Sequence, residues 1–349
     1  MQLNTIGWDI GGAHVKAAVL NPSGEITGIF QQACPLWKGL DYLRQAAIAI
    51  LQALPQGENR HAITMTGELA DLFASREDGV RQIIATMIQI LGSSDLLIFA
   101  GTHGLQGAKQ IVAEHYPAIA SANWLVSAGF AARKAGSGLF VDIGSTTTDI
   151  LRFSDGKVLA EGYTDYQRLM SRELVYTGIV RTPVMAVAQT VQEGAHDIGI
   201  MAEHFATMAD VYRLTGELNE AYDQAETADG AEKTMIASAR RLSRMIGCDF
   251  YPDELPRWQQ LAGNIRARQL QLIMSACLQV AAGAALSKHT VWVGAGVGRF
   301  LVRQLAQQLD CRYVDFSELC PSYPIHMDML PADCAPAVSV AYFAMAMEG

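Results

Sequence analysis

Two stretches of this chain repeat the same short pattern, and that repeat restricts the fold more than any other feature of the sequence. Residues 9–14 read DIGGAH and residues 142–149 read DIGSTTTD, with alternating apolar residues before and after each stretch. The alternation predicts two β-strands at each place, joined by a tight turn that depends on glycine. Two copies so far apart indicate two similar α/β lobes, because a solenoid repeats over much shorter distances.

Length, composition and charge agree with two folded lobes and argue against some partners. A chain of 349 residues is long for one core, and 50% of its residues are hydrophobic while only 17% are charged, which disfavours disorder. The formal net charge is −9 and the pI is about 5.4. An acidic surface disfavours nucleic acid and anionic membranes as partners. An anionic ligand therefore needs a local binding site.

The cysteines and the start of the chain predict a soluble, cytoplasmic protein. The six cysteines are scattered, without a CxxC pair or a zinc-type Cys/His array, so we expect reduced thiols. Residues 1–9 lack the basic and apolar regions of a secretion signal. The most apolar long stretch, residues 270–286, contains glutamine and serine, and we interpret it as a buried helix and not as a membrane span.

Periodicity predicts a first lobe at residues 1–125 and a second at 126–349. The first lobe is predicted to contain a hairpin at 5–20, a strand at 25–31, a helix at 40–54, a strand at 61–66, a helix at 80–91 and a strand at 96–100. The second is predicted to contain strands at 139–142, 148–153, 158–162 and 291–293, a helix at 300–309, and a mostly helical insertion at about 190–286. In that insertion the clearest helices are at 202–214 and 232–246, and residues 218–230 form an acidic surface segment. A last helix at 337–347 begins after Pro336, and we consider that it packs back on the first lobe.

Both glycine turns have the chemistry of a phosphate site. Glycine lets backbone N–H groups approach phosphate oxygens, and an Asp at the strand end suits magnesium, which prefers oxygen ligands. We therefore predict Asp9 and Asp142 as metal ligands, although a plain hairpin with a turn Asp is the alternative for a single copy. The candidate phosphate ligands are Gly11, Gly12, Ala13, His14, Gly144, Ser145, Thr146 and Thr147.

Charged residues near the turns are candidates for catalysis. Lys16 follows the first turn and would neutralise phosphate charge, or it is a solvated strand lysine. Asp149 follows the second turn and is either catalytic or holds the loop. Arg181 lies in a loop near a proline and would bind phosphate in a bidentate manner. Glu68 follows a strand, and Asp210 lies on a predicted helix with Arg213 nearby. For Glu68, Arg181 and Asp210, a structural ion pair or a helix cap is the alternative.

A third glycine element, residues 294–298 (GAGVG), follows an apolar strand. It departs from the GxGxxG dinucleotide pattern, because its third glycine comes one residue early. Gly294, Gly296 and Gly298 either cradle a nucleoside or phosphate at the start of the next helix, or allow close packing of helix and strand.

Two Asp-Gly turns followed by a late glycine element resemble the superfamily of actin, sugar kinases and heat-shock chaperone ATPases. The resemblance implies two ribonuclease-H-like lobes around a central cleft, with the turns as phosphate loops and the late glycines as an adenosine loop. Residues 140–150 (FVDIGSTTTDI) resemble the hydantoinase/oxoprolinase branch, although Ser145 stands where that branch usually has glycine. Hydantoin hydrolysis is not implied, because the large hydantoinase and oxoprolinase subunits are much longer.

Further motifs resemble the small proteins of the tetrahydromethanopterin-linked one-carbon pathway, over nearly the whole chain. These motifs are residues 65–71 (MTGELAD), 122–124 (ANW), 176–183 (YTGIVRTP) and 209–213 (ADVYR). In methanofuran biosynthesis, relatives join an aminomethylfuran-methanol diphosphate to the phenol of γ-glutamyltyramine and release diphosphate. The resemblance implies a transferase with small-molecule diphosphate and phenolic amine substrates.

The resemblance also implies roles for individual residues. Magnesium held by the two turn aspartates, with Lys16 and Arg181, would stabilise the leaving diphosphate, and Asp149 or Asp210 would help to deprotonate the phenol. Glu68 and Asn123 would contact substrate. Whether ATP binds stays open, and a homodimer is a further possibility. The alternatives are an ATP-dependent kinase or amidohydrolase of the same fold, and a non-catalytic nucleotide-binding scaffold.

Overall fold

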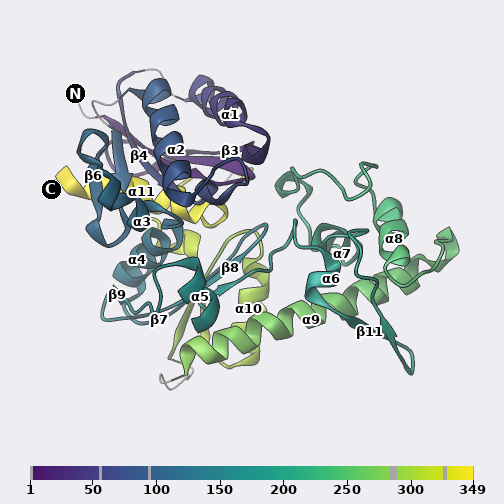
Figure 1. The fold of residues 1–349 in the computed structure, drawn as a ribbon. Helices are drawn as coiled ribbons and strands as arrows, with labels where there is room; N and C mark the ends of the chain where they lie inside the picture. Colours follow the sequence, from purple (N-terminus) through teal and green to yellow (C-terminus); the bar gives the residue numbers. More distant parts are fainter. Residues whose placement is uncertain (1–2, 55–56, 93–95, 283–288, 325–327, 349) are drawn as a thin grey trace. The chain divides into compact units, whose positions relative to one another are not determined.

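The computed structural model describes residues 3–54, 57–92, 96–282, 289–324 and 328–348 (Figure 1). The chain divides into two compact units. The first comprises Met1–Gly138, Arg152–Asp165 and Val314–Gly349, and the second comprises Leu139–Leu151 and Tyr166–Tyr313.

The first unit contains a six-stranded mixed sheet in the order β3-β2-β1-β4-β5-β6. Its strands are β1 (Asn4–Ile10), β2 (His14–Leu20), β3 (Ile26–Ala33), β4 (Asn59–Met65), β5 (Leu96–Phe99) and β6 (Leu105–Gly107). Strands β1, β2 and β3 are antiparallel neighbours, whereas β4 runs parallel to β1 and to β5. This arrangement confirms the predicted hairpin and the predicted strands of the first lobe.

Helices of the first unit pack against both faces of this sheet, as strand alternation requires. They are α1 (Leu40–Ala53), α2 (Arg76–Leu91), α3 (Tyr116–Ile119), α4 (Asn123–Ala135) and α11 (Ala335–Met345). Ile6, Trp8 and Ile10 form one core with residues of α1 and α2. Gly7, which alternates with them, contacts α11, and a second cluster joins α11 and α4 to β4 and β5. The C-terminal helix therefore lies on the first unit's sheet (Figure 1).

The sheet of the second glycine turn has the order β10-β8-β7-β13-β14, with β9 paired to β8. Its strands are β7 (Gly138–Ile143), β8 (Thr148–Ser154), β9 (Lys157–Val158), β10 (Leu174–Val175), β13 (Val291–Ala295) and β14 (Arg312–Asp315). The second hairpin of the sequence repeat is thus confirmed. The strand predicted at 158–162 is much shorter, because only Lys157 and Val158 pair with β8.

A mostly helical region follows. Its helices are α5 (Asp165–Ser171), α6 (Val184–Val187), α7 (Met208–Leu214), α8 (Met235–Arg244), α9 (Leu255–Ala281) and α10 (Arg299–Gln308). Residues of α7, α8 and α9 share one buried cluster, with Tyr212 and Trp258 fully buried. Within the described parts of the chain, no helix combines the length and the apolar character needed to cross a bilayer.

Several predicted boundaries in this region were wrong. Residues 190–199 form a hairpin, β11 (Thr190–Glu193) and β12 (His196–Gly199), and not a helix. Helix α7 begins only at Met208, because Thr207 caps it and donates its N–H to the Asp210 carboxylate. The buried helix predicted at 270–286 is the end of α9, which also exposes Leu272 and Leu278, and residues 283–286 lie outside the described residues.

The domain limits also differ from the prediction. A boundary after residue 125 would cut α4, which packs as a whole against α11 in the first unit. The first unit extends to Gly138, and it regains the chain at residues 152–165 and 314–349.

We predict that Gly7→Ala strongly destabilises the first unit. A Cβ at this position would lie 2.0 Å from the backbone oxygen of Ala337, so α11 would have to move off the sheet. Overpacking against backbone should lower the free energy of unfolding by about 3 kcal/mol, measured by urea denaturation. Gly263→Ala is the matched control, because a Cβ there meets no atom within 4 Å and should stabilise α9 by about 1 kcal/mol. Equal stability of the two variants would contradict this account of α11 packing.

Candidate functional site

The first turn is fixed by backbone hydrogen bonds, both within the turn and from the segment that follows β3. The N–H of Gly11 donates to His14 O at 2.9 Å and closes the turn between β1 and β2. Behind it, the N–H groups of Cys34 and Leu36 donate to the carbonyls of Ala13 and Gly12 at 2.8 and 3.0 Å. A Cβ added to Gly12 would meet no heavy atom within 4 Å. The turn is therefore rigid at its carbonyls and open at Gly12.

Asp9 lies at the end of β1 on the α4 and α11 face of the sheet. It pairs across the strands with Lys16, so the two side chains share that face. The side-chain amide of Asn123, the first residue of α4, donates to Asp9 Oδ1 at 3.4 Å. Lys16 donates from Nζ to the backbone oxygen of Asp333 at 2.7 Å. The contact of Lys16 with the segment that precedes α11 differs from the predicted contact with phosphate.

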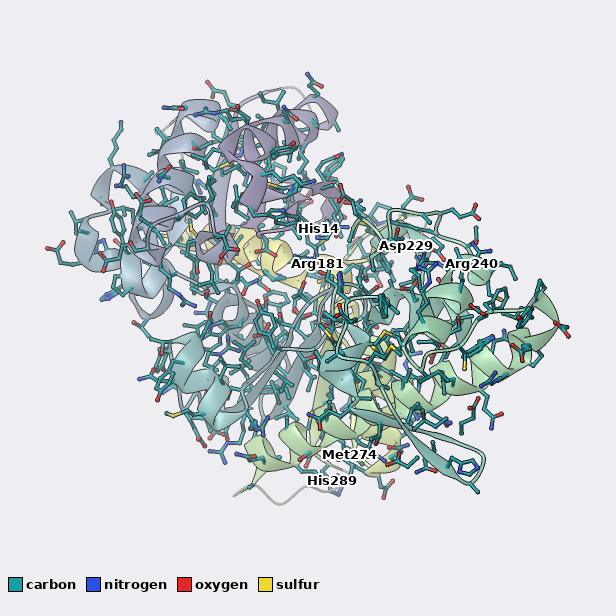
Figure 2. The ribbon with its side chains drawn as sticks, turned by 45° about the vertical axis from the view of Figure 1, so that its right-hand side comes forward. His14, Arg181, Asp229, Arg240, Met274 and His289 are labelled. Atoms are coloured by element: carbon teal, nitrogen blue, oxygen red, sulfur yellow. The ribbon has the colours of Figure 1, made fainter. Side chains whose placement is uncertain are left out.

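His14 begins β2 and is 8% exposed, so most of its side chain is buried (Figure 2). Glu68 lies in the short 3-10 helix η2 (Gly67–Leu69) after β4 and is 1% exposed. Its Oε1 accepts a hydrogen bond from Ser121 Oγ at 2.6 Å. Burial raises the pKa of the Glu68 carboxyl, and the Ser121 hydroxyl and Arg76 oppose that rise. With no exposed surface, Glu68 is not placed to touch substrate as predicted.

The second turn is held by the loop after β10. Gly144 N–H donates to Thr147 O at 2.9 Å, and the N–H groups of Val180 and Arg181 donate to Ser145 O at 3.0 and 2.8 Å. A Cβ on Gly178 would come within 2.5 Å of Thr146 N. The glycine in this loop therefore lets two backbones touch, and residues 144–147 of the turn stay partly exposed.

Arg181 places a cation beside the second turn (Figure 2). Its Nη1 lies 3.5 Å from Thr146 Oγ1, and the residue is only partly exposed. Burial lowers the pKa of the Arg181 guanidinium, which Tyr176 opposes, but an arginine stays charged at neutral pH. A fixed charge next to turn hydroxyls is the arrangement that an anionic ligand needs.

The late glycines pack against the base of the second turn. Gly296 has φ +77°, and a Cβ there would lie 2.3 Å from Asp142 Oδ1 and from Ile143 O. Gly298 N–H donates to Ile143 O at 2.8 Å, and a Cβ on Gly294 would collide with the Tyr313 ring. A Cβ on Gly298 would meet the Ile143 and Ile179 side chains at 2.5 and 2.6 Å. Close packing, against backbone at Gly296 and against side chains at Gly294 and Gly298, therefore explains all three glycines, although the predicted packing was between helix and strand.

Asp149, one of the carboxylates predicted to be catalytic, has a structural partner. Asp149 Oδ1 accepts from Arg168 Nη2 at 2.6 Å, and Arg168 is 1% exposed and also donates to Glu173 O. Because a buried arginine fixes this carboxylate beside β10, the structure favours the loop-holding role of Asp149 over the catalytic one.

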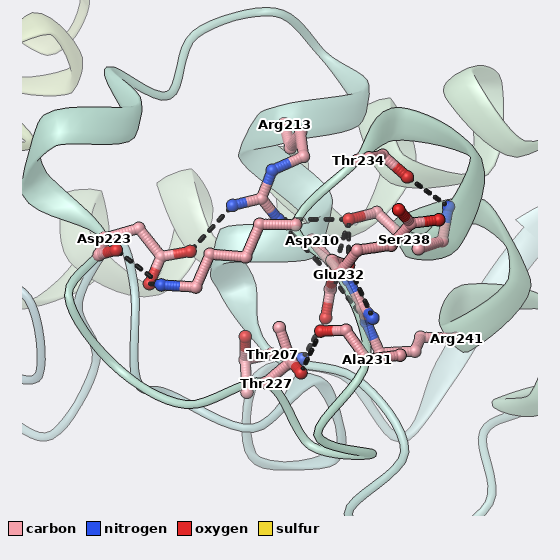
Figure 3. Close-up of polar contacts among 12 residues, drawn as sticks. Thr207, Asp210, Arg213, Asp223, Thr227, Ala231, Glu232, Thr234, Ser238 and Arg241 are labelled. Atoms are coloured by element: carbon pink, nitrogen blue, oxygen red, sulfur yellow. Dashed lines mark hydrogen bonds and ion pairs between the residues drawn. The ribbon is translucent and has the colours of Figure 1, made fainter.

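Asp210 lies in a buried network of the helical region (Figure 3). Its Oδ1 accepts from Ser238 Oγ at 2.7 Å and from Arg241 Nε at 2.8 Å, and Oδ2 accepts from Thr207 N–H at 3.0 Å. Arg213 in turn binds Asp223 at 2.7 Å. Asp210 therefore caps α7 and joins it to α8, and this replaces the predicted role as a base.

The predicted site residues thus fall into two sets. Asp9, Lys16, Asn123, Glu68 and the first turn belong to the first unit, whereas Asp142, Arg181, the second turn and the late glycines belong to the second. No group of three or more His, Cys, Asp or Glu side chains suited to a metal occurs among the described residues. Sequence reasoning missed Ser121 and Arg168, because neither lies in a motif that signals its partner.

The fold defines the class to which this protein belongs. The fold is similar to that of acetone carboxylase, in a nucleotide-free structure from work on ATP-dependent acetone carboxylation. The TM-score is 0.57 at 12% identity, and the match covers 99% of this chain and 70% of the other. Twin strand–turn–strand units in two α/β lobes are the actin-like ATPase fold that the sequence predicted.

The family follows from the sequence comparison. The model of the hydantoinase/oxoprolinase family matches residues 59–333, and the chain belongs to this family. It is 32% identical over 250 residues to the (4-{4-[2-(gamma-L-glutamylamino)ethyl]phenoxymethyl}furan-2-yl)methanamine synthase of Methanocaldococcus jannaschii, a match that covers 71% of this chain and 73% of the relative. The synthase of the same name from Methanococcus vannielii is 33% identical over 112 residues, which are 32% of this chain and 50% of that protein. These matches confirm the predicted resemblance.

We predict that Asp210→Asn destabilises the second unit. The change removes one of the two carboxylates that pair with Arg241, which is fully buried, and leaves Asp229 as the other. It also removes the ion pair between Asp210 and Arg213. Breaking a buried ion pair from one side should cost about 3 kcal/mol, measured as the free energy of unfolding in urea. Asp197→Asn on the exposed end of β12 is the control and should change stability by less than about 0.5 kcal/mol. A loss as small as that of the control would show that Asp210 does not support the fold.

Proposed function

We propose that this chain is a transferase of methanofuran-type cofactor biosynthesis. It condenses an aminomethylfuran-methanol diphosphate with the phenol of tyramine or γ-glutamyltyramine and releases diphosphate. The observation that carries the proposal is the 32% identity, over most of both chains, to a synthase whose name describes a phenoxymethyl furan. In the reaction a bond forms between the furan methylene carbon and the phenol oxygen. The bond from that carbon to the diphosphate oxygen breaks, and the phenol loses its proton.

The two turns are proposed to bind the diphosphate. The first offers backbone N–H groups around Gly12, where no side chain fills the space. The second offers the hydroxyls of Ser145, Thr146 and Thr147, with Arg181 held 3.5 Å from one of them. Such groups stabilise the negative charge that grows on a leaving diphosphate. His14 and Lys16 contribute less directly, because His14 is buried in β2 and Lys16 binds the segment before α11.

Magnesium is proposed as the cofactor, with Asp9 and Asp142 as its protein ligands. Each aspartate by itself suits the ion, because it is a carboxylate at a strand end beside a turn, and magnesium takes few protein oxygens and keeps several waters. Asp142 is held where only a glycine at position 296 leaves room for its Oδ1. When bound, the ion would neutralise diphosphate charge. Asp9 is oriented by the amide of Asn123, which assigns Asn123 a role in the site without a contact to substrate.

The remaining expectations stay predictions. A homodimer and a cytoplasmic location follow only from the sequence arguments. ATP binding stays open, because the late glycines are explained by packing and the fold is shared with an ATP-dependent enzyme. The alternative of an ATP-dependent kinase or amidohydrolase therefore enters the test.

The test is thermal stabilisation of the purified protein by ATP, ADP, inorganic diphosphate and a furfuryl diphosphate, each with magnesium, followed by an assay of diphosphate release with tyramine. A ligand that binds only the folded state at about a hundred times its Kd adds roughly 2.7 kcal/mol. We expect stabilisation by the diphosphates and release that depends on the phenol. Stabilisation by ATP with hydrolysis, and no phenol-dependent release, would replace the transferase by an ATP-dependent enzyme.

We further predict that Gly12→Ala weakens diphosphate binding without unfolding the protein. A Cβ at Gly12 meets no atom of the protein within 4 Å, so stability should change by less than about 0.5 kcal/mol. The same Cβ would occupy the space through which phosphate oxygens reach the backbone, and the Kd should rise at least about tenfold, or ~1.4 kcal/mol. Gly199→Ala, equally open but on the β12 hairpin, should leave both unchanged. Urea denaturation gives the stability and calorimetric titration gives the Kd, and an unchanged Kd for Gly12→Ala would remove the first turn from the site.

A further inference from the structure

Glu68 is a fully buried carboxyl for which the proposed mechanism has no use. Its backbone is fixed on two sides by glycines that allow close contact. A Cβ on Gly67 would lie 3.2 Å from Ile10 O and 3.3 Å from the carbonyl carbon of Gly11, so η2 packs against the first turn itself. A Cβ on Gly79 of α2 would lie 2.5 Å from Glu68 O. Glu68 is thus clamped between the turn and α2.

The carboxyl of Glu68 reaches one hydrogen-bond partner. Ser121 Oγ donates to Oε1 at 2.6 Å, whereas Oε2 is buried without a hydrogen-bond partner. Ser121 has φ +50°, a left-handed conformation that serine adopts rarely and that needs support from its surroundings. The hydroxyl of Ser121, a residue with strained backbone, is therefore bound by the carboxyl of Glu68, which is fully buried.

Ser121 lies two residues before α4, which begins at Asn123. Asn123 Nδ2 donates to Asp9 Oδ1 at 3.4 Å. The position of Asn123 depends on the path of the chain into the helix, and the conformation of Ser121 sets that path. One sequence of contacts thus leads from Glu68 through Ser121 and Asn123 to the carboxylate at the first turn.

We propose that Glu68 is a positioning residue for the first turn. Through the Ser121 hydroxyl, Glu68 sets the start of α4 and so holds Asn123 against Asp9. The inference rests on the proposed function only for the role of Asp9 as a magnesium ligand. In this role Glu68 acts through its acceptor oxygen Oε1, to which the Ser121 hydroxyl donates at 2.6 Å. Burial raises the pKa of the Glu68 carboxyl, and the hydrogen bond from Ser121 opposes that rise. Glutamine, which keeps an acceptor oxygen in the same place, should replace it.

The first experiment needs no ligand. Hydrogen exchange of the backbone amides of residues 121–125 and 9–14 is compared in the wild type, Glu68→Gln, Glu68→Met, Ser121→Ala and the Glu68→Met/Ser121→Ala double variant. We expect exchange at the start of α4 to rise at least about tenfold in Glu68→Met and Ser121→Ala, and to stay within about twofold in Glu68→Gln. The double variant should equal either single variant, because the two residues act as one unit. Additive effects, or a Gln variant as perturbed as the Met variant, would overturn the proposal.

Two further variants serve as controls for this experiment. Ser121→Gly removes the hydroxyl but accepts φ +50°, so it should fold and still show faster exchange at residues 121–125. If it exchanges like the wild type, the hydroxyl bond has no role. Ser339→Ala is the matched control, because Ser339 lies fully buried in α11 of the same unit and its hydroxyl has no hydrogen-bond partner. It should leave exchange at both segments unchanged.

The second experiment separates positioning from a general loss of structure. In the diphosphate-release assay, Glu68→Met and Ser121→Ala should raise the magnesium concentration for half-maximal rate at least about tenfold, while kcat at saturating magnesium falls less than about threefold. An equal fall at all magnesium concentrations would indicate damage to the fold and overturn the role at Asp9. If the wild-type protein releases no diphosphate, the proposed function fails, and the exchange experiment still decides the link between Glu68 and α4.

Discussion

Contact between backbones at glycine positions is the constraint on which both turns depend. A turn that binds phosphate must keep its N–H side open, so its rigidity has to come from the other side. In the second turn that support comes from Gly178, Gly296 and Gly298, each of which lies where a Cβ would come within 2.6 Å of another segment. In the first turn Gly67 has the same position relative to Ile10 and Gly11. The repeat in the sequence therefore marks the side of each turn that we propose binds diphosphate, and the glycines elsewhere in the chain build its back.

The loop between α7 and α8 is held by buried charge more than by regular structure. Between α7 and α8, residues 215–234 contain only the short 3-10 helix Glu220–Tyr222, and the predicted acidic surface segment lies here. Its Asp223 is in fact buried, where it accepts from Arg213 and pairs with Lys233 at 3.2 Å. A buried ion pair adds little net stability, but each member becomes costly once its partner is lost. We infer that this network, together with Leu218 and Ala225, which pack on the apolar cluster, specifies one path for a loop with few apolar residues.

The sequence predicted the hairpins better than the contacts of the polar residues. Strand alternation and glycine turns are local signals, so the Asp9 and Asp142 turns, strands β1 to β5 of the first unit and the late glycine element were found, whereas the three-residue strand β6 was not. Residues 190–199 were expected to be helical because long-range periodicity hid a hairpin of two four-residue strands with Gly194 at its turn, where φ is +59°. Asp149 looked catalytic because its partner Arg168 lies on the next helix, and no motif connects the two. Partners brought together by tertiary structure leave no periodic signal.

The positions where local preferences are broken identify the region under functional constraint. Glycine at position 79, inside α2, costs about 1 kcal/mol relative to alanine, and a serine with positive φ costs roughly 1–3 kcal/mol. Both residues touch Glu68, which itself is a buried acid with an unused oxygen. The glycine is required by the close approach of Glu68, because a Cβ at position 79 would lie 2.5 Å from Glu68 O. The strained serine and the buried acid, in contrast, give the core nothing that a relaxed serine loop and an apolar side chain would not give at lower cost. They become reasonable once the start of α4 must hold Asn123 at one place beside Asp9, since a strained and fully enclosed arrangement allows fewer alternative positions than a relaxed one.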